Sequence, residues 1–186
     1  VQLISPEQMK EIKSESNVKA GGPDAHVQAV EAQRVWWEEG YTGKNIVVAV
    51  LDSGTNTNHL DLKDHLWTGY IDTNNDGTPD TYVNGWNFIN NNSNITDDYG
   101  HGTHCAGIVC GDGTSGQKTG IAPDATLMTI KIIGGGRCTA QNLVDGVEKA
   151  AELGADIISL SVGRENPDEN RALFRQTFSN LLKSNI

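Results

Sequence analysis

Short apolar runs alternate with amphipathic segments along this chain, and that order predicts an α/β fold. Runs rich in Val, Ile and Leu stand at residues 45–52 (NIVVAVLD), 126–133 and 156–162. Near-continuous apolar runs of this length are typical of strands that are buried on both faces of a parallel sheet. Segments of helical periodicity follow or separate them, so we expect a parallel sheet with right-handed crossovers.

The helices are predicted from apolar positions that recur every three or four residues. They span residues 25–39, 101–110 and 139–153, and a last helix begins near residue 166. Gly40 and Gly154 stand where the first and third helices should stop. In the first helix we expect one face to carry Val27, Val30, Arg34 and Trp37. The last helix is expected to bury a stripe of Leu173, Phe174, Thr177, Phe178, Leu181 and Leu182.

Domain organisation follows from length and from the polar breaks. Residues 1–23 are interpreted as an N-terminal arm that ends at a Gly-Gly-Pro sequence, and residues 24–186 as one domain of ordinary size. Residues 53–100 are mostly loop, with a short strand near 83–89. Because no strand follows the last helix, we expect an exposed apolar sheet edge, which offers a surface for dimerisation.

Charge and cysteine content exclude several classes of partner and of fold. The chain carries 14 basic and 24 acidic residues, a net charge of −10, whereas nucleic-acid sites need clustered Lys and Arg. No apolar run is long enough to span a bilayer. Cys105, Cys110 and Cys138 are too few for a disulfide framework, so all three are expected to be reduced.

Two residues carry the candidate chemistry. Asp52 ends the first apolar run, at the carboxyl end of a strand, where functional groups gather in open α/β sheets. Taken alone, it is also consistent with a turn-capping Asp. His101 opens a predicted helix, and His104 follows three residues later. This spacing, without an intervening Glu, does not match the i, i+4 histidine pair of zinc peptidases.

The local sequences around these residues resemble the subtilisin-like serine peptidase family. VAVLDSG contains Asp52, NHLDL stands at 58–62, and GHGTHCAG at 100–107 contains His101. The order Asp before His also matches that family. The resemblance covers roughly residues 25–185. It implies a subtilisin-like fold with a parallel sheet flanked by helices, truncated before its last strands.

The resemblance also implies a role for each matching residue. Asp52 would orient the imidazole of His101, which would act as general base and then as general acid. The partner would be a polypeptide, held by main-chain hydrogen bonds as an added strand. Its two walls would be Gly134, Gly135 and Gly136 on one side and Ser161, Val162 and Gly163 on the other. The parent protein would be a secreted endopeptidase, and His104 would be structural.

Two parts of such an enzyme are missing from this sequence. Neither an Ala-Gly-Asn-like strand for the oxyanion hole nor a Gly-Thr-Ser-Met-Ala-like nucleophile sequence is present. Ser115 follows Gly113-Thr114, but it precedes a predicted strand instead of opening a helix, so we reject it as nucleophile. We therefore expect this chain to be inactive alone and to need the missing C-terminal half of the catalytic domain. The alternative is a naturally truncated pseudopeptidase or interaction module.

Two further motifs remain. The glycine pattern at 111–116 satisfies GxGxxG but follows a helix, so a dinucleotide site is not expected. Residues 72–80 read D-x-N-x-D-G-x-x-D, and oxygen ligands at alternate positions around a Gly can wrap one Ca²⁺. The candidate ligands are Asp72, Asn74, Asp76 and Asp80. The alternative is an ordinary polar turn, because Asn and Asp favour turns.

Overall fold

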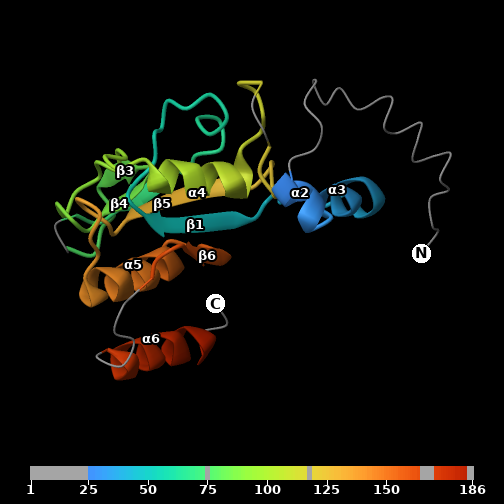
Figure 1. Cartoon of the computed structure of the whole chain (residues 1–186). Coiled ribbons are helices and arrows are strands. Elements are labelled where there is room, and N and C mark those ends of the chain that lie inside the picture. Colours follow the sequence, from blue (N-terminus) through green and yellow to red (C-terminus); the bar gives the residue numbers. More distant parts are fainter. Residues whose placement is uncertain (1–24, 74–75, 117–118, 164–169, 184–186) are drawn as a thin grey trace, which may run out of the picture.

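The protein is built around a four-stranded parallel sheet (Figure 1). The computed structural model describes residues 25–73, 76–116, 119–163 and 170–183. In the order of the sheet, the strands are β4 (Gly85–Asn87), β5 (Thr126–Lys131), β1 (Val47–Asp52) and β6 (Ile157–Leu160). The three apolar runs of the sequence thus form adjacent strands, and the predicted α/β fold with a parallel sheet flanked by helices is confirmed.

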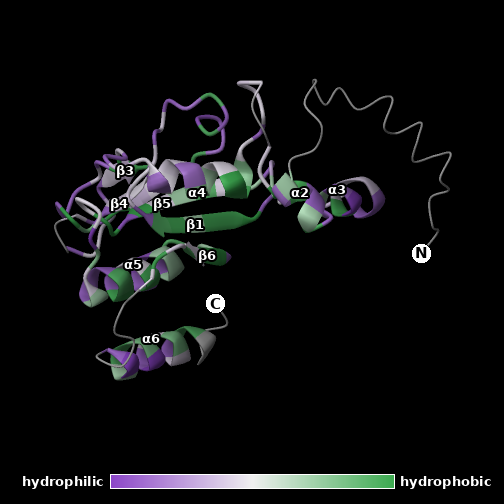
Figure 2. Cartoon of the chain, in the orientation of Figure 1, coloured by the Kyte–Doolittle hydropathy of each residue, from purple (hydrophilic) through white to green (hydrophobic). Residues whose placement is uncertain are grey.

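The central strand β1 separates two hydrophobic clusters. Val48 and Val50 face α4 (His101–Cys110), whereas Ala49 and Leu51 face α5 (Ala140–Glu152) on the opposite side of the sheet. This alternation is the period of two that a strand imposes on its side chains. Figure 2 shows β1 as hydrophobic between the two helices. Burial on both faces explains why its sequence reads as one apolar run.

The helix α5 matches its prediction closely. Its N-cap is Thr139, whose side chain accepts a hydrogen bond from the backbone N–H of Asn142 at 3.0 Å. Gly154 follows its end with a φ of +83°, a left-handed conformation that Gly adopts readily. The strands on either side are shorter than predicted: β5 ends at Lys131 instead of residue 133, and β6 starts at Ile157.

The N-terminal helical region differs from its prediction. In place of one helix over residues 25–39, the chain forms α2 (Ala25–Ala29), α3 (Ala32–Arg34) and a π-helical turn, η1 (Val35–Glu39). Glu31 interrupts the run with a left-handed φ of +54°. The buried side chains are Val27 and Ala32, which are five residues apart and would not share one face of a regular helix. The break brings both inward and leaves Val30 exposed.

The region between β1 and α4 is largely loop, as expected, but its strands differ from the single one predicted. β2 (Gly69–Ile71) and β3 (Thr81–Val83) pair as an antiparallel hairpin, in which the rings of Tyr70 and Tyr82 lie 5.3 Å apart. β4 then joins the main sheet beside β5. The predicted strand at 83–89 is therefore two short strands in two different sheets.

The last helix, α6 (Arg171–Lys183), packs against α5. Thr177 is buried and Leu173, Phe174 and Leu181 are half-buried, but Phe178 is 42% exposed, so its predicted burial is wrong. The predicted start near residue 166, the side chain of Leu182 and the arm of residues 1–23 lie outside the described residues.

One edge of the sheet is open in the part of the chain that the structure describes. β6 pairs with β1 on one side only, and Ile157 on this strand is 52% exposed. Ile158 and Leu160 are half-buried. This is the apolar edge expected from the sequence, whereas dimerisation through it stays a prediction.

Within the described residues, none of the helices has the length and apolar character needed to cross a membrane.

Candidate active site

Asp52 and His101 lie in direct contact at the carboxyl end of the sheet. Asp52 is the last residue of β1 and its side chain is 1% exposed, whereas His101 is the first residue of α4. His101 Nδ1 lies 2.8 Å from Asp52 Oδ1 and 2.9 Å from Oδ2. The sequence interpretation required these two side chains, 49 residues apart, to meet within proton-sharing distance, and they do so.

The Asp52 carboxylate is held in a fixed orientation. The backbone N–H of Ser53 donates to Asp52 Oδ1 at 2.7 Å, beside the imidazole contact. A buried carboxylate without such donors would cost several kcal/mol relative to water. Because a carboxylate only accepts, His101 Nδ1 carries a proton in this arrangement, which leaves Nε2 as the basic atom of a neutral ring.

The His101 ring is bound to a buried carboxylate at one nitrogen and is partly exposed to solvent elsewhere. Its side chain is 42% exposed although one ring nitrogen is bound to a buried carboxylate. An imidazole that is oriented at Nδ1 and accessible elsewhere can take a proton from a nucleophile and return it to a leaving group. The geometry therefore suits proton transfer during acyl transfer.

Cys105 completes a cluster with this pair. Its Sγ lies 3.8 Å from His101 Nδ1 and 3.9 Å from Nε2. Burial is the main cause that raises the pKa of the Cys105 thiol, a hydrogen bond with Ser161 lowers it, and the negative charge of Asp52 raises it. The thiol therefore stays protonated at neutral pH and is not a ready nucleophile. His101 and Cys105 are four residues apart on one helix, so the sequence alone indicated that their side chains are neighbours.

The cluster is also the one group of three potential metal ligands in the described part of the chain. The ligand atoms of Asp52, His101 and Cys105 all lie within 4.8 Å of one another. In the arrangement seen, the proton on Nδ1 bridges to the carboxylate and the thiol keeps its own proton. The short contacts between Nδ1 and the carboxylate are those expected of an Asp–His pair.

The first predicted substrate wall, Gly134 to Gly136, is a tight turn. The N–H of Gly134 donates to the carbonyl of Arg137 at 3.0 Å, and the N–H of Arg137 donates back at 3.1 Å. Gly135 and Gly136 have φ values of +56° and +73°. These positive φ values reverse the chain at the turn, and whether Gly134 to Gly136 bind substrate stays a prediction.

The second predicted wall is brought close to the Asp–His pair. Ser161 interacts with Cys105, which contacts His101. Val162 and Gly163 line a cavity of about 160 Å³ together with residues at the start of α5 and on α6: Cys138, Thr139, Ala140, Leu143 and Phe174. The segment after the glycine turn, and not the turn itself, thus faces Val162 and Gly163. Whether substrate binds there stays a prediction.

Two other side chains singled out in the sequence lie apart from the pair. His104 lines a separate cavity of about 560 Å³ together with His26 and His59. The hydroxyl of Ser115 donates to Asp61 Oδ2 at 2.7 Å instead of contacting His101. This contact agrees with the rejection of Ser115 as nucleophile.

Residues that surround the pair, in particular Asp97 and Lys131, were not predicted from the sequence. Asp97, in the loop before α4, accepts hydrogen bonds from Ser53 and from the first residues of the helix. Lys131, at the end of β5 and 2% exposed, donates to the Ser53 carbonyl and, at 2.8 Å, to Asp98 Oδ1. Two features of the sequence could have indicated these residues. Asp97 is an acid four residues before His101, and Lys131 is a charged residue at the end of an apolar strand.

The predicted calcium loop has the right donor atoms, but they do not converge. Asp72 Oδ2 accepts the N–H of Gly77 at 2.7 Å, and Asp80 Oδ1 accepts the hydroxyls of Thr73 and Thr81, each at 2.8 Å. Asp72, Asp76 and Asp80 do not form a group of mutually close ligands among the described residues, and Asn74 lies outside them. A calcium site here would have to form on binding and stays a prediction.

Comparisons with known proteins agree with this geometry. The subtilase family matches residues 43–183. The chain is 42% identical over 137 residues to the minor extracellular protease Vpr of Bacillus subtilis (strain 168), covering 71% of this chain and 16% of that protein. It is 35% identical over 139 residues to the major intracellular serine protease of the same organism, covering 74% of this chain and 40% of that protein.

A solved structure shares the fold. The crystal structure of a lanthipeptide protease superposes with a TM-score of 0.59 and 22% identity, over 82% of this chain and 39% of that chain. The chain therefore spans less than half the length of each of these three relatives. Because the family match covers most of the chain and includes both Asp52 and His101, the chain belongs to the subtilase family.

Proposed function

We propose that this chain supplies the Asp and the His of a serine endopeptidase. The observation that carries the proposal is the buried Asp52 carboxylate bound to Nδ1 of the half-exposed His101. Asp52 fixes the tautomer and orientation of the ring and stabilises the imidazolium. His101 Nε2 takes the proton of a serine hydroxyl as it attacks the peptide carbonyl, and then protonates the leaving amine.

The nucleophile and the oxyanion donor would come from outside residues 1–186. The sequence holds no Gly-Thr-Ser-Met-Ala segment, and the hydroxyl of Ser115 is bound to Asp61. Asp and His without nucleophile and oxyanion hole give little catalysis. The chain alone is therefore proposed to be inactive, with the remaining part of the catalytic domain as its partner.

The proposed substrate is a polypeptide. Support comes from the family and from the neighbourhood of His101, where Ser161 touches Cys105 and Val162 and Gly163 line a cavity. An extended peptide beside residues 161–163 would lie along the open edge of the site. An extracellular location is part of the proposal, although the relatives include both an extracellular and an intracellular protease.

The test uses the full-length protein that carries this chain, with casein as substrate. His101→Ala is expected to lower kcat by about 10⁴-fold or more. His104→Ala is the matched control, because His104 lies one turn along the same helix in a different cavity, and it should retain activity. Equal hydrolysis by the unmodified protein and His101→Ala would contradict the proposal.

A further inference from the structure

The Asp97 carboxylate is saturated with hydrogen bonds from groups on both sides of the Asp–His pair. Oδ1 accepts the Ser53 hydroxyl at 2.8 Å, the Tyr99 N–H at 3.0 Å and the Gly100 N–H at 2.8 Å. Oδ2 accepts the N–H of Thr103 at 2.8 Å and its hydroxyl at 2.6 Å. Five donors for one carboxylate are more than a capping residue needs to satisfy a helix start.

These contacts join the two elements that carry Asp52 and His101. Ser53 follows Asp52 directly, and its hydroxyl oxygen also accepts the Gly102 N–H at 2.9 Å in a buried contact. Tyr99, Gly100 and Thr103 belong to the loop and first turn that present His101. Asp97 thus bonds to the chain next to the carboxylate and to the chain on both sides of the imidazole.

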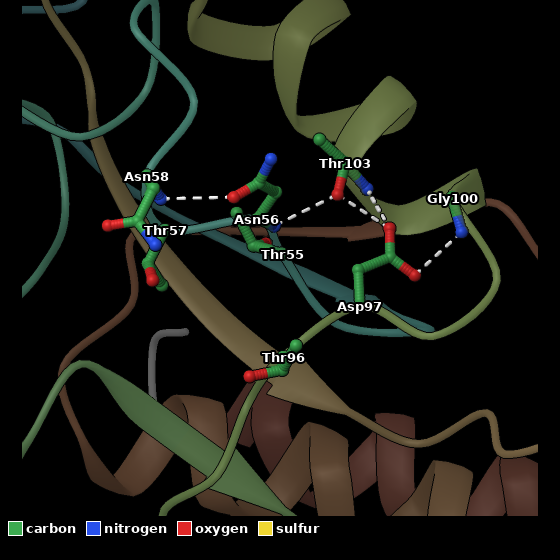
Figure 3. A pocket seen from close by; sticks show the side chains of 8 residues that line it. All are labelled: Thr55, Asn56, Thr57, Asn58, Thr96, Asp97, Gly100 and Thr103. Atoms are coloured by element: carbon green, nitrogen blue, oxygen red, sulfur yellow. Dashed lines mark hydrogen bonds between the residues drawn. The ribbon is translucent and has the colours of Figure 1, made fainter.

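Thr103 adds a second link between the same elements. Its hydroxyl oxygen accepts the Asn56 N–H at 2.9 Å while the hydroxyl donates to Asp97. Figure 3 shows Asp97 between Gly100 and Thr103, with the Asn56 bond on the other side of the Thr103 hydroxyl. The first turn of α4 is therefore tied to residues 53–56 at two points.

Ligand binding in the neighbouring pocket does not explain the hydrogen bonds of Asp97 better than a positioning role does. This pocket has a volume of about 370 Å³ and is lined by residues 55–58 together with Thr96, Asp97, Gly100 and Thr103. Asp97 is the single charged residue in this lining. Because both of its oxygens already accept bonds from the protein, it has little capacity left for a ligand.

We propose that Asp97 is a positioning residue of the Asp–His pair: by bonding Ser53 and the first turn of α4 together, it sets the His101 ring against Asp52. This inference rests on the proposed peptidase function. The hydrogen bonds of Asp97 go to Ser53, Tyr99, Gly100 and Thr103 and not to His101, so it would act through Ser53 and the first turn of α4. A displacement of about 1 Å at a reacting group can cost about 10²-fold in rate, so a loosened first turn should affect chemistry before binding.

The test compares variants of the full-length protein that carries this chain. Asp97→Asn removes the charge with little change in shape, and Thr103→Val removes the hydroxyl with little change in volume. Thr103→Ser keeps the hydroxyl and should therefore retain the activity that Thr103→Val loses. Val147→Ala is the control for general destabilisation, because Val147 is a fully buried residue of α5 that takes no part in these hydrogen bonds.

Two readouts separate this inference from the proposed function. In peptide hydrolysis, Asp97→Asn and Thr103→Val are expected to lower kcat by about 10- to 100-fold with a nearly unchanged KM. In NMR of histidine-labelled protein, the Nδ1 proton of His101 should lose its protection from exchange with water in these two variants. Thr103→Ser and Val147→Ala should keep both properties.

Each outcome decides one of the two proposals. Unmodified protein that shows no His101-dependent hydrolysis contradicts the peptidase function, and the NMR readout then still tests Asp97. Asp97→Asn and Thr103→Val proteins that are folded and keep the protected Nδ1 proton overturn the positioning role. An equal loss of kcat in Val147→Ala also overturns it, because the effect would then reflect stability alone.

Discussion

Gly102 lies against Gly54 so closely that a Cβ atom added to Gly102 would stand 2.2 Å from the Gly54 carbonyl oxygen. Gly102 follows His101, and Gly54 is two residues beyond Asp52. The neighbouring atoms are backbone and cannot move aside as a flexible side chain does. This approach lets the first turn of α4 rest on the end of β1, which is what brings the two functional side chains together.

Gly102→Ala is therefore expected to destabilise the protein by about 1–3 kcal/mol, the usual cost of overpacking. Gly107→Ala on the same helix is the matched control, since a Cβ there meets no atom within 4 Å. It should stabilise by up to about 1 kcal/mol, because Ala is the better helix former. Urea unfolding of both variants measures the difference. Equal effects of the two substitutions would contradict the proposed close contact.

Asp97 should make stability depend on pH in acid. Partial burial alone would raise the pKa of Asp97, but hydrogen bonds from the Thr103 side chain and from the backbone of Gly100, Thr103 and Tyr99 outweigh it and hold the pKa well below 3.8. A group whose pKa is lowered by folding contributes stability above its unfolded pKa, and this is lost as pH falls towards the folded value.

The variant Asp97→Asn tests the direction of this pH dependence of stability. Its free energy of unfolding should fall furthest below that of the unmodified protein at about pH 6–7, and the gap should shrink below about pH 4. Denaturant unfolding of both proteins over this range gives the measurement. A gap that stays constant or widens in acid would show that the Asp97 charge is not what the hydrogen bonds stabilise.

The three thiols should differ in reactivity. Burial raises the pKa of all three thiols, to about 12 for Cys110, but Cys138 is exposed, Cys105 is half-buried and Cys110 is buried. Because the thiolate is the reactive form, iodoacetamide at neutral pH should modify Cys138 first, Cys105 slowly and Cys110 only on unfolding. Mass spectrometry of timed samples gives the order. Fast modification of Cys110 in folded protein would contradict the packing of α4 on the sheet.

The calcium prediction is tested by thermal unfolding. If residues 72–80 bind Ca²⁺ in the folded state, millimolar Ca²⁺ should raise Tm, since a ligand that binds only the folded state stabilises it. The rise should be smaller in Asp76→Ala than in the unmodified protein. Mg²⁺ at the same concentration serves as the control for ionic strength. Equal rises in both proteins would remove this loop as a site.

The sequence predicted the sheet and the position of the Asp–His pair because strong local patterns meet there. β1 and β5 are buried on both faces, so their composition alone marks them as strands. Asp52 and His101 each stand at the junction of such an element with a loop. Their contact then follows from the parallel sheet, whose strand ends share one edge with the helix starts.

Other features depend on tertiary packing that leaves no period in the sequence. The break at Glu31 exists because Val27 and Ala32 both bury, and the turn at Gly134 depends on reciprocal bonds with Arg137. Asp97 lies in a loop without periodicity, and its partners Ser53 and Thr103 come from different elements. Such a network is visible only when the elements are placed in space.

A double-mutant cycle in the full-length protein tests most directly whether Asp52 and His101 work as one unit. The measurement is kcat for peptide hydrolysis by Asp52→Asn, His101→Ala and the double variant. If Asp52 acts only by orienting and stabilising the His101 imidazole, the double variant should be no slower than His101→Ala, because groups that act as a unit are not additive. Rate losses that multiply in the double variant, or full activity in either single variant, would contradict the account.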